Sequence, residues 1–165
     1  MSLILRTATA DDVGAIHGLM RELAVFENLL DIFESTPQSV HDALFGNAPA
    51  AECLVATWDG NVVGYALYFH NFSTFLGRRG LYLEDVYVQP TMRGKGVGQA
   101  LLRELARIAI QRDCARFEWT VLDWNQPAID FYASQGATVL PEWRVVRMTG
   151  DALENFANGG GTQTS

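Results

Sequence analysis

The stretch "VYVQPTMRGKGVGQALLREL", residues 86–105, decides the fold. It begins as a β-branched and aromatic run, passes through three glycines interleaved with two cationic residues, and continues with helical spacing of apolar residues. The pattern predicts a strand, a glycine-rich turn and a helix in immediate succession. Backbone N–H groups at a helix N-terminus are unpaired and lie at the positive end of the helix dipole, so such a turn favours an anion.

The glycine loop reads R-G-K-G-V-G over residues 93–98. Its glycines allow a phosphate to approach the backbone, and Arg93 and Lys95 add positive charge. A flexible turn is the alternative interpretation. The loop lacks the G-x-x-x-x-G-K-[ST] spacing of a P-loop, and it is one residue shorter than the G-x-G-x-x-G dinucleotide fingerprint. A kinase and a nucleotide-dependent oxidoreductase therefore both fit poorly, whereas a phosphate or pyrophosphate of another ligand fits.

The composition is that of a soluble globular protein, with 165 residues, 48% of them hydrophobic, and a net charge of −7. We expect one domain over residues 1–157 and a disordered tail over 158–165. The negative charge argues against nucleic-acid binding, and no apolar run approaches the roughly 20 residues that span a membrane. No signal-peptide pattern opens the chain and the two cysteines lack metal-ligand spacing, so we expect a cytoplasmic protein without a metal.

Hydrophobic periodicity predicts the order strand, two helices, three strands, helix, strand, helix, strand. Thr9 with Asp12 marks the start of the first helix, and Thr36 followed by proline marks the second. Asp59-Gly60 between two alternating runs predicts a tight hairpin. The expected strands are "SLILRTA" (2–8), the hairpin pair within 52–70, "LYLEDVYV" (81–88), "ARFEWTVL" (115–122) and "WRVVRMT" (143–149). A helix between the strands at 81–88 and 115–122 indicates a parallel crossover, so the fold class is α/β (α+β) with a mixed sheet.

The loop R-G-x-G-x-G resembles the acetyl-CoA pyrophosphate loop of the GCN5-related N-acetyltransferases (GNAT superfamily). The segments "RELAVFENL", "LYLEDVYV", "DWNQPAIDFYASQGA" and "EWRVVRM" resemble, in that order, the diamine (spermidine/spermine) acetyltransferase group, and "NFSTFLGR" resembles its thialysine branch. The resemblance covers nearly the whole chain. It implies a mixed central sheet of about six to seven strands flanked by helices, with splayed central parallel strands. It also implies acetyl-CoA as cosubstrate, no metal and a homodimer.

Glu84 is the first candidate catalytic residue. In a regularly alternating strand it shares one face with Tyr82 and Val86, whereas Asp85 lies on the other. A carboxylate within an apolar strand is costly unless it is paired or used, although an exposed position on an edge strand would also explain it. The resemblance implies an active-site glutamate at this position.

Glu27 is the second candidate. Alone it would be a surface glutamate, but Phe26-Glu27 resembles the Tyr-Glu pair that contacts substrate in diamine acetyltransferases. An alkylamine has a pKa of about 10.4 and is mostly protonated at neutral pH, so a carboxylate must hold the ammonium and help to remove its proton. Phe26 lacks the usual hydroxyl, which changes one contact of polyamine recognition.

Tyr132 lies on one helical stripe with Asn125 and Ala128. From spacing alone it would be a core aromatic residue, and Asn125 would only cap its helix. The resemblance implies that Tyr132 protonates the leaving thiolate and that Asn125 contacts the pantetheine arm. Trp143 either lines the acceptor pocket or fills the core.

The resemblance also implies the cofactor contacts. Backbone groups of residues 86–88 would pair with pantetheine like an added strand. Residues 133–135 lack the lysines or arginines that often reach the CoA phosphates in the family, so Arg93, Lys95 or Arg103 must supply that charge. The expected cofactor-binding residues are Val86, Tyr87, Val88, Arg93, Gly94, Lys95, Gly96, Val97, Gly98, Gln99, Asn125, Ala128 and Tyr132.

The predicted function is transfer of an acetyl group from acetyl-CoA to a primary amine of a small cationic substrate, such as a polyamine, a diamine or a thialysine-like compound. In this hypothesis Glu27, Glu84 and Tyr132 are catalytic, and Phe26, Glu27, Glu84 and Trp143 contact the substrate. One alternative keeps acetyl-CoA and changes the acceptor to a protein or aminoglycoside amine. The other is a catalytically silent acyl-CoA-binding module.

Overall fold

The computed structural model describes residues 2–160. The chain divides into two compact units, one up to Thr120 and one from Val121 onward. The single-domain organisation of residues 1–157 stays a prediction. Residues 161–165 of the expected tail lie outside the described residues.

The first unit is built on a five-stranded sheet in the order β1-β2-β3-β4-β5. The first three pairings are antiparallel, and β4 pairs with β5 in parallel. This confirms the predicted mixed sheet and the parallel crossover. The strands are β1 (Leu3–Thr7), β2 (Glu52–Trp58), β3 (Asn61–Ser73), β4 (Arg78–Val88) and β5 (Phe117–Glu118).

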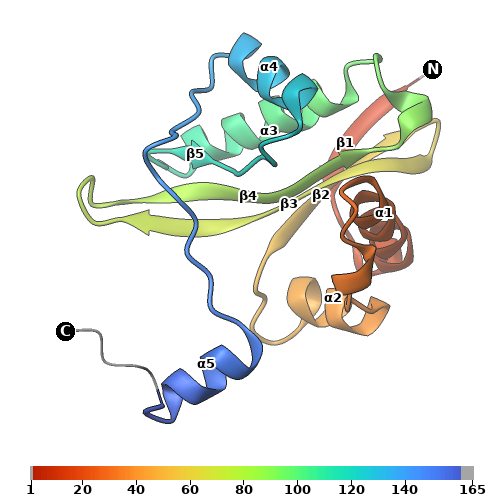
Figure 1. Ribbon diagram of the computed structural model, residues 1–165. Coiled ribbons are helices and arrows are strands. Elements are labelled where there is room, and N and C mark those ends of the chain that lie inside the picture. The colour runs from red at the N-terminus through yellow and green to blue at the C-terminus, as the bar shows by residue number, and fades with distance from the viewer. Residues whose placement is uncertain (1, 161–165) are drawn as a thin grey trace. The chain divides into compact units, whose positions relative to one another are not determined.

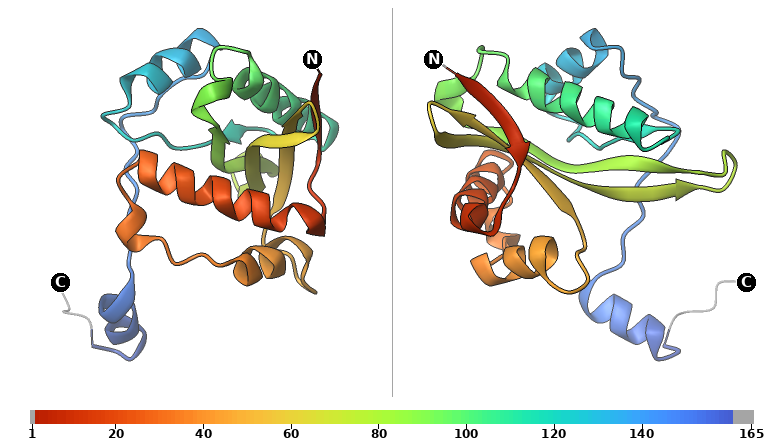
Figure 2. Two further views of the ribbon diagram at one scale, coloured as in Figure 1. Left: turned by 90° about the vertical axis from the view of Figure 1, so that its right-hand side faces the viewer. Right: turned by 180° about the vertical axis from the view of Figure 1, so that it is seen from behind.

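Helices cover both faces of this sheet, with α1 and α2 on one face and α3 on the other (Figures 1 and 2). Ile16 of α1 and Tyr65 of β3 are fully buried on the α1 side, and Leu101 and Leu105 of α3 are fully buried on the other side. The helical elements of this unit are η1 (Ala10–Asp12), α1 (Val13–Phe26), η2 (Leu30–Ile32), α2 (Pro37–Phe45), η3 (Pro90–Met92) and α3 (Val97–Gln111).

The local turn and cap signals are confirmed. Asp59 and Gly60 both have positive φ, 49° and 86°, as a type I′ hairpin turn requires. The Oγ1 of Thr36 accepts a hydrogen bond from the backbone N–H of Ser39 at 3.1 Å, which caps α2 ahead of its first proline.

The predicted last strand at 143–149 is wrong. The second unit contains α4 (Gln126–Ser134) and α5 (Gly150–Ala157), and its described residues include no strand. A strand needs a neighbour for its backbone hydrogen bonds, and residues 143–149 have none within this unit. The described sheet therefore has five strands rather than the six to seven expected. The helix α5 was not predicted from the sequence.

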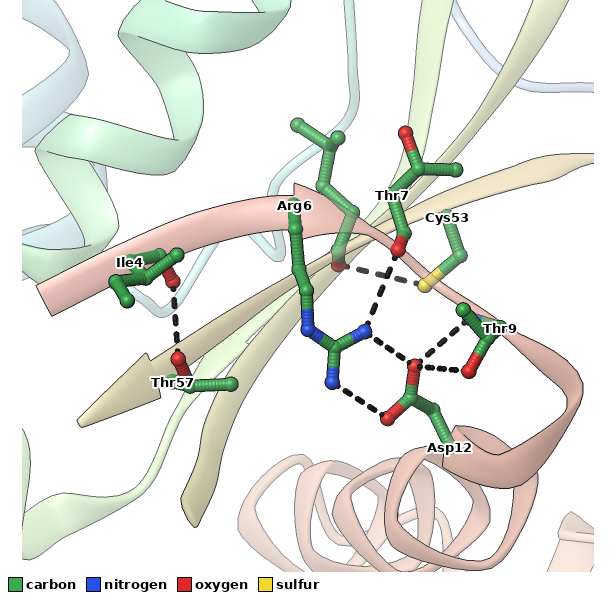
Figure 3. Close-up of polar contacts among 8 residues, drawn as sticks. Ile4, Arg6, Thr7, Thr9, Asp12, Cys53 and Thr57 are labelled. Carbon is green, nitrogen blue, oxygen red and sulfur yellow. Dashed lines mark hydrogen bonds and ion pairs between the residues drawn. The ribbon is translucent and has the colours of Figure 1, made fainter. Parts of the chain in front are cut away.

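One ion pair fixes the start of α1 against the sheet (Figure 3). Arg6 of β1 donates to both carboxylate oxygens of Asp12, at 2.6 and 2.9 Å. The backbone N–H of Thr9 donates to the same carboxylate at 2.7 Å. Asp12 is one of the few buried charged residues, and its hydrogen bonds to Arg6 lower its pKa to about 2. Its charge is therefore stabilised in the folded state.

Asp12→Asn should lower the free energy of unfolding by about 1–3 kcal/mol, because a bidentate hydrogen-bonded ion pair is lost. The depressed pKa means that the contribution of Asp12 is complete above about pH 4 and is lost as the pH falls towards 2. Urea unfolding of the variant should therefore show a shallower loss of stability over that range.

The control is Glu104→Gln, which removes the partly exposed pair between Arg107 and Glu104 at 2.8 Å. This change should alter stability by no more than about 0.5 kcal/mol. Equal losses in the two variants, or an unchanged acid dependence in Asp12→Asn, would contradict the assignment.

Candidate functional site

A register shift between β3 and β4 shapes the site. Tyr68 pairs with Leu83 and Leu67 pairs with Asp85, so Glu84 is an extra residue without a partner across the ladder. This is the geometry of a β-bulge, which bends its strand and redirects the side chains around it.

The bulge contradicts the regular alternation expected for this strand. Leu83 and Val86 pack in the same core, on the α3 side, although alternation places them on opposite faces. Tyr87 packs in the other core, with Tyr65. The extra residue shifts the side-chain parity by one, so the two acidic neighbours at the bulge do not follow the predicted faces.

A cavity of about 460 Å³ lies between the α1–α2 side of the sheet and these two helices. Glu27, Glu84 and Asp85 all line it, so the first unit brings the two predicted glutamates to one cavity and adds a third carboxyl group. No Lys, Arg or His occurs among its described lining residues. The remaining lining residues are mostly apolar: Met20, Leu23, Ala24, Leu29, Ile32, Phe33, Ser35, Ser39, Val40, Ala43, Leu44 and Leu67.

Asp85 is the site residue that sequence reasoning missed. Burial, and then the charge of Glu84, raise its pKa to about 6, and Glu27 adds to this effect. The Tyr65 hydroxyl donates to its Oδ2 at 3.2 Å. Glu84 is exposed to solvent, so Asp85 is the carboxylate of this strand whose charged form is disfavoured by burial. The signal in the sequence was the adjacent Glu-Asp pair within an apolar run.

Glu27 is the first residue after α1 and forms the C-cap of this helix. Its backbone N–H donates to the carbonyl of Leu23 at 2.9 Å, which fixes its position. Burial raises the pKa of its carboxyl group. Carboxyl groups with raised pKa values, as Glu27 and Asp85 have, can hold an ammonium group and exchange a proton with it.

The glycine loop has the geometry that an anion site needs. Gly94 and Gly96 have φ of 78° and 79°, in the left-handed region that glycine adopts most easily. Gly96 is the N-cap of α3, and it offers no side chain to the first N–H groups of the helix. Those groups can therefore meet a phosphate, and the loop fits the pyrophosphate of CoA.

The two loop cations lie over aromatic rings. The Arg93 guanidinium is 5.1 Å from the ring centre of Phe26 and 5.9 Å from that of Tyr87. Lys95 Nζ is 5.1 Å from the ring centre of Trp58. Cation–π contacts of this kind hold the positive charges close to the loop. Arg93 thereby links the expected phosphate loop to the end of α1, where Phe26 precedes Glu27.

The central parallel strands pair over a short ladder, and their predicted splay stays a prediction. The parallel ladder of β4 and β5 comprises only Leu81 with Phe117 and Tyr82 with Glu118. Beyond it, residues 83–88 have no strand on that side among those the structure describes. The open edge offers backbone groups to an extended ligand, as the expected pantetheine contacts at 86–88 require.

The other predicted site residues belong to the second unit. Asn125 Oδ1 accepts a hydrogen bond from the backbone N–H of Ala128 at 3.4 Å, so Asn125 caps α4. Tyr132 lies on the same helix, with its ring centre 5.8 Å from that of Phe131. Trp143 lies in the irregular segment between α4 and α5. The roles of these residues in catalysis and binding stay predictions.

Residues 2–160 contain no group of three or more His, Cys, Asp or Glu side chains arranged to hold a metal ion. No helix within the same residues is both long and apolar enough to cross a membrane.

Several curated proteins are similar to the chain over most of its length. A thialysine N-epsilon-acetyltransferase from Sus scrofa is 36% identical, over 94% of this chain and 98% of that protein. An L-ornithine N5-acetyltransferase from Arabidopsis thaliana is 32% identical, over 91% and 86%. A human spermidine/spermine N(1)-acetyltransferase-like protein is 34% identical over 93% of this chain, which spans only 23% of that longer protein.

Solved structures share the fold. An integron cassette protein from V. cholerae superposes with a TM-score of 0.81 at 27% identity, over 95% of this chain and 98% of that chain. An aminoglycoside acetyltransferase from an uncultured soil metagenomic sample, at 18% identity, has a TM-score of 0.72 over 90% of this chain and all of that chain. The profile of the acetyltransferase (GNAT) family matches residues 20–137. The chain belongs to this family and is an N-acetyltransferase enzyme.

Proposed function

We propose that this enzyme transfers an acetyl group from acetyl-CoA to a primary amine of a small cationic substrate, such as a polyamine, a diamine or a thialysine-like compound. The observation that carries the proposal is the cavity lined by Glu27, Glu84 and Asp85, with no cationic side chain among its described lining residues. Carboxylates on an otherwise apolar wall favour a positively charged amine on a methylene chain. The names of the thialysine and ornithine relatives agree with an amine of this kind.

Different side chains of the protein carry out different steps of the proposed reaction. Glu27 and Glu84 hold the ammonium group and help to remove its proton, because the neutral amine is the nucleophile. Tyr132 delivers a proton to the departing thiolate, and a phenol of pKa about 10 does so only when its geometry favours the transfer. Phe26 and Trp143 contact the apolar part of the amine.

The CoA moiety of acetyl-CoA would be held by the open edge of β4, by the glycine loop and by α4. Acetyl-CoA supplies the reactive thioester. The N–H groups at the start of α3, together with Arg93 and Lys95, neutralise its phosphates, while residues 86–88 orient the pantetheine arm. Gln99, Asn125 and Ala128 complete the proposed contacts. No metal takes part in this proposal.

Two further expectations belong to the proposal, namely a homodimer and a cytoplasmic location. The dimer is supported by the end of β3 and its connection to β4, where Phe72, Phe75 and Leu76 are 64%, 94% and 47% exposed. Apolar side chains gathered on a projecting hairpin are typical of a surface that a partner covers. A second copy of the chain is the partner that we propose.

Gly96→Ala should weaken acetyl-CoA binding and lower the free energy of unfolding by about 1–2 kcal/mol, because alanine is strained at a φ of 79°. Isothermal titration and thermal unfolding measure the two effects. Gly18→Ala is the matched control, since a Cβ there meets nothing within 4 Å on the exposed face of α1. That change should raise stability by about 0.5–1 kcal/mol and leave binding unchanged. Equal affinity in the two variants would argue against a phosphate site at this loop.

Amine-dependent release of free thiol from acetyl-CoA tests the enzyme activity and the substrate class together. The panel contains polyamines, thialysine, ornithine, lysine and an aminoglycoside, each assayed with wild-type enzyme, Glu84→Gln and Tyr132→Phe. We expect turnover with a small aliphatic amine, and a loss of about 100-fold or more in each variant. Binding of acetyl-CoA without turnover of any amine would favour a silent binding module, and turnover of the aminoglycoside alone would replace the proposed substrate class.

Sedimentation velocity tests the proposed dimer. Wild-type protein should sediment as a dimer, and Phe75→Asp should shift it towards the monomer because a charge cannot be buried in an apolar contact. Thr74→Asp, on the same turn, is the control for added charge. A wild-type protein that sediments as a monomer at all concentrations would contradict the dimer without affecting the proposed activity.

A further inference from the structure

A buried tyrosine is hydrogen-bonded to one of the three carboxyl groups that line the cavity. Tyr65 of β3 is fully buried, and its hydroxyl donates to Oδ2 of Asp85 at 3.2 Å. The two residues are diagonal neighbours across the β3–β4 ladder, where Tyr65 pairs with Tyr87 and Leu67 pairs with Asp85. Asp85 lines the cavity, whereas Tyr65 does not. A hydroxyl from outside the cavity lining therefore binds one oxygen of a carboxylate that belongs to the lining.

Every described group that acts on Asp85 is either neutral or negatively charged. Glu84 on its own strand and Glu27 from the end of α1 both disfavour its charge. Cys53 of β2 is buried, and burial raises the pKa of its thiol to about 12, so this group stays neutral. The helix α2 contributes Ser39 to the cavity, which does not titrate. The Tyr65 hydrogen bond is thus the stabilising contact with the ionised form of Asp85.

The same interaction keeps Tyr65 a hydrogen-bond donor. Burial, and then the charge of Asp85, raise the pKa of the Tyr65 phenol well above its ordinary value. Tyr65 is therefore protonated around neutral pH, and its hydroxyl can donate a hydrogen bond to the carboxylate. A buried phenylalanine would pack equally well in this core, so packing alone does not require the hydroxyl.

We propose that Asp85 is the group that accepts the proton from the amine, and that Tyr65 is a positioning residue that keeps Asp85 competent to do so. This inference rests on the proposed function and goes beyond it by assigning the proton to one carboxylate. Glu27 and Glu84 then attract the ammonium, while Asp85, whose pKa lies near 6, acts as the base close to neutral pH.

The protons balance in this scheme. The ammonium nitrogen gives one proton to Asp85, which passes it to solvent. The neutral nitrogen forms its bond to the acetyl carbon as the carbon–sulfur bond breaks. The second proton leaves the nitrogen for solvent as the amide forms, and the departing sulfur takes a proton from Tyr132, which solvent then reprotonates. Each turnover forms one amide and one thiol and releases one proton in total.

The decisive variant is Tyr65→Phe, which removes the hydroxyl and keeps the ring. Loss of the hydrogen bond should raise the pKa of Asp85, so the acidic limb of the kcat/KM profile should move up by roughly half to one pH unit. Activity at pH 6 should fall several-fold, while activity at pH 9 should stay near that of wild type. Asp85→Asn should lose about 100-fold or more at all pH values.

Two measurements separate this effect from simple destabilisation. Tyr68→Phe removes another buried hydroxyl from the same strand, on the α3 side, and its pH profile should coincide with that of wild type. Titration of 13C-labelled aspartate carboxyl groups by NMR, in protein without any ligand, should show the same upward shift for Asp85 in Tyr65→Phe. The Asp85 signal is identified by its absence in Asp85→Asn.

The outcomes distinguish the two proposals. If wild-type enzyme acetylates an amine but the Tyr65→Phe profile and the Asp85 titration do not move, the inference is overturned and the proposed function stands. If no amine is acetylated by wild type, the proposed function fails, and the catalytic role of Asp85 fails with it. Full activity of Asp85→Asn at neutral pH would assign the proton to another group.

Discussion

The β-bulge at Glu84 is the constraint on which the site depends. One extra residue in β4 breaks the alternation of the strand, so Glu84 and its neighbour Asp85 both reach the cavity on the α1 side. A regular strand would send adjacent side chains to opposite faces of the sheet. The same strand loses its parallel partner after Tyr82, which leaves the backbone of residues 83–88 open on the β5 side. In the proposed function, this one short segment would serve the amine through the bulge and acetyl-CoA through its backbone groups.

The chemistry of the cavity follows from placing like charges together under partial burial. Burial, and then the charges of Glu84 and Glu27, make the ionisation of Asp85 harder, and burial also raises the pKa of Glu27. In the proposed function, a bound ammonium group would relieve this repulsion, and the site would therefore favour cations. The hydroxyl of Tyr65 moves the balance for one carboxylate back towards the charged form. The site can therefore both attract a protonated amine and take its proton.

Local signals in the sequence predicted most of the first unit. The Asp59-Gly60 turn, the cap at Thr36 and the apolar face of α3 each depend on residues close together in the chain, and all three are confirmed. The glycine loop was identified for the same reason, since Gly94 and Gly96 adopt the positive φ that the spacing indicates.

Features that depend on distant partners escaped prediction. The bulge is a property of two strands in register, so neither β3 nor β4 alone reveals it, and the burial of Asp85 follows from it. The strand expected at 143–149 has the composition of a strand but lacks a neighbour in its unit.

The most direct test of this account is a crystal structure of the enzyme with CoA and the amine that it acetylates. The account predicts that the amine nitrogen lies within hydrogen-bonding distance of Asp85 or Glu84, and that the CoA pyrophosphate lies on the N–H groups at the start of α3. An amine bound away from the carboxylates of the α1–α2 cavity would contradict it. So would a pyrophosphate bound elsewhere than the loop at residues 93–98.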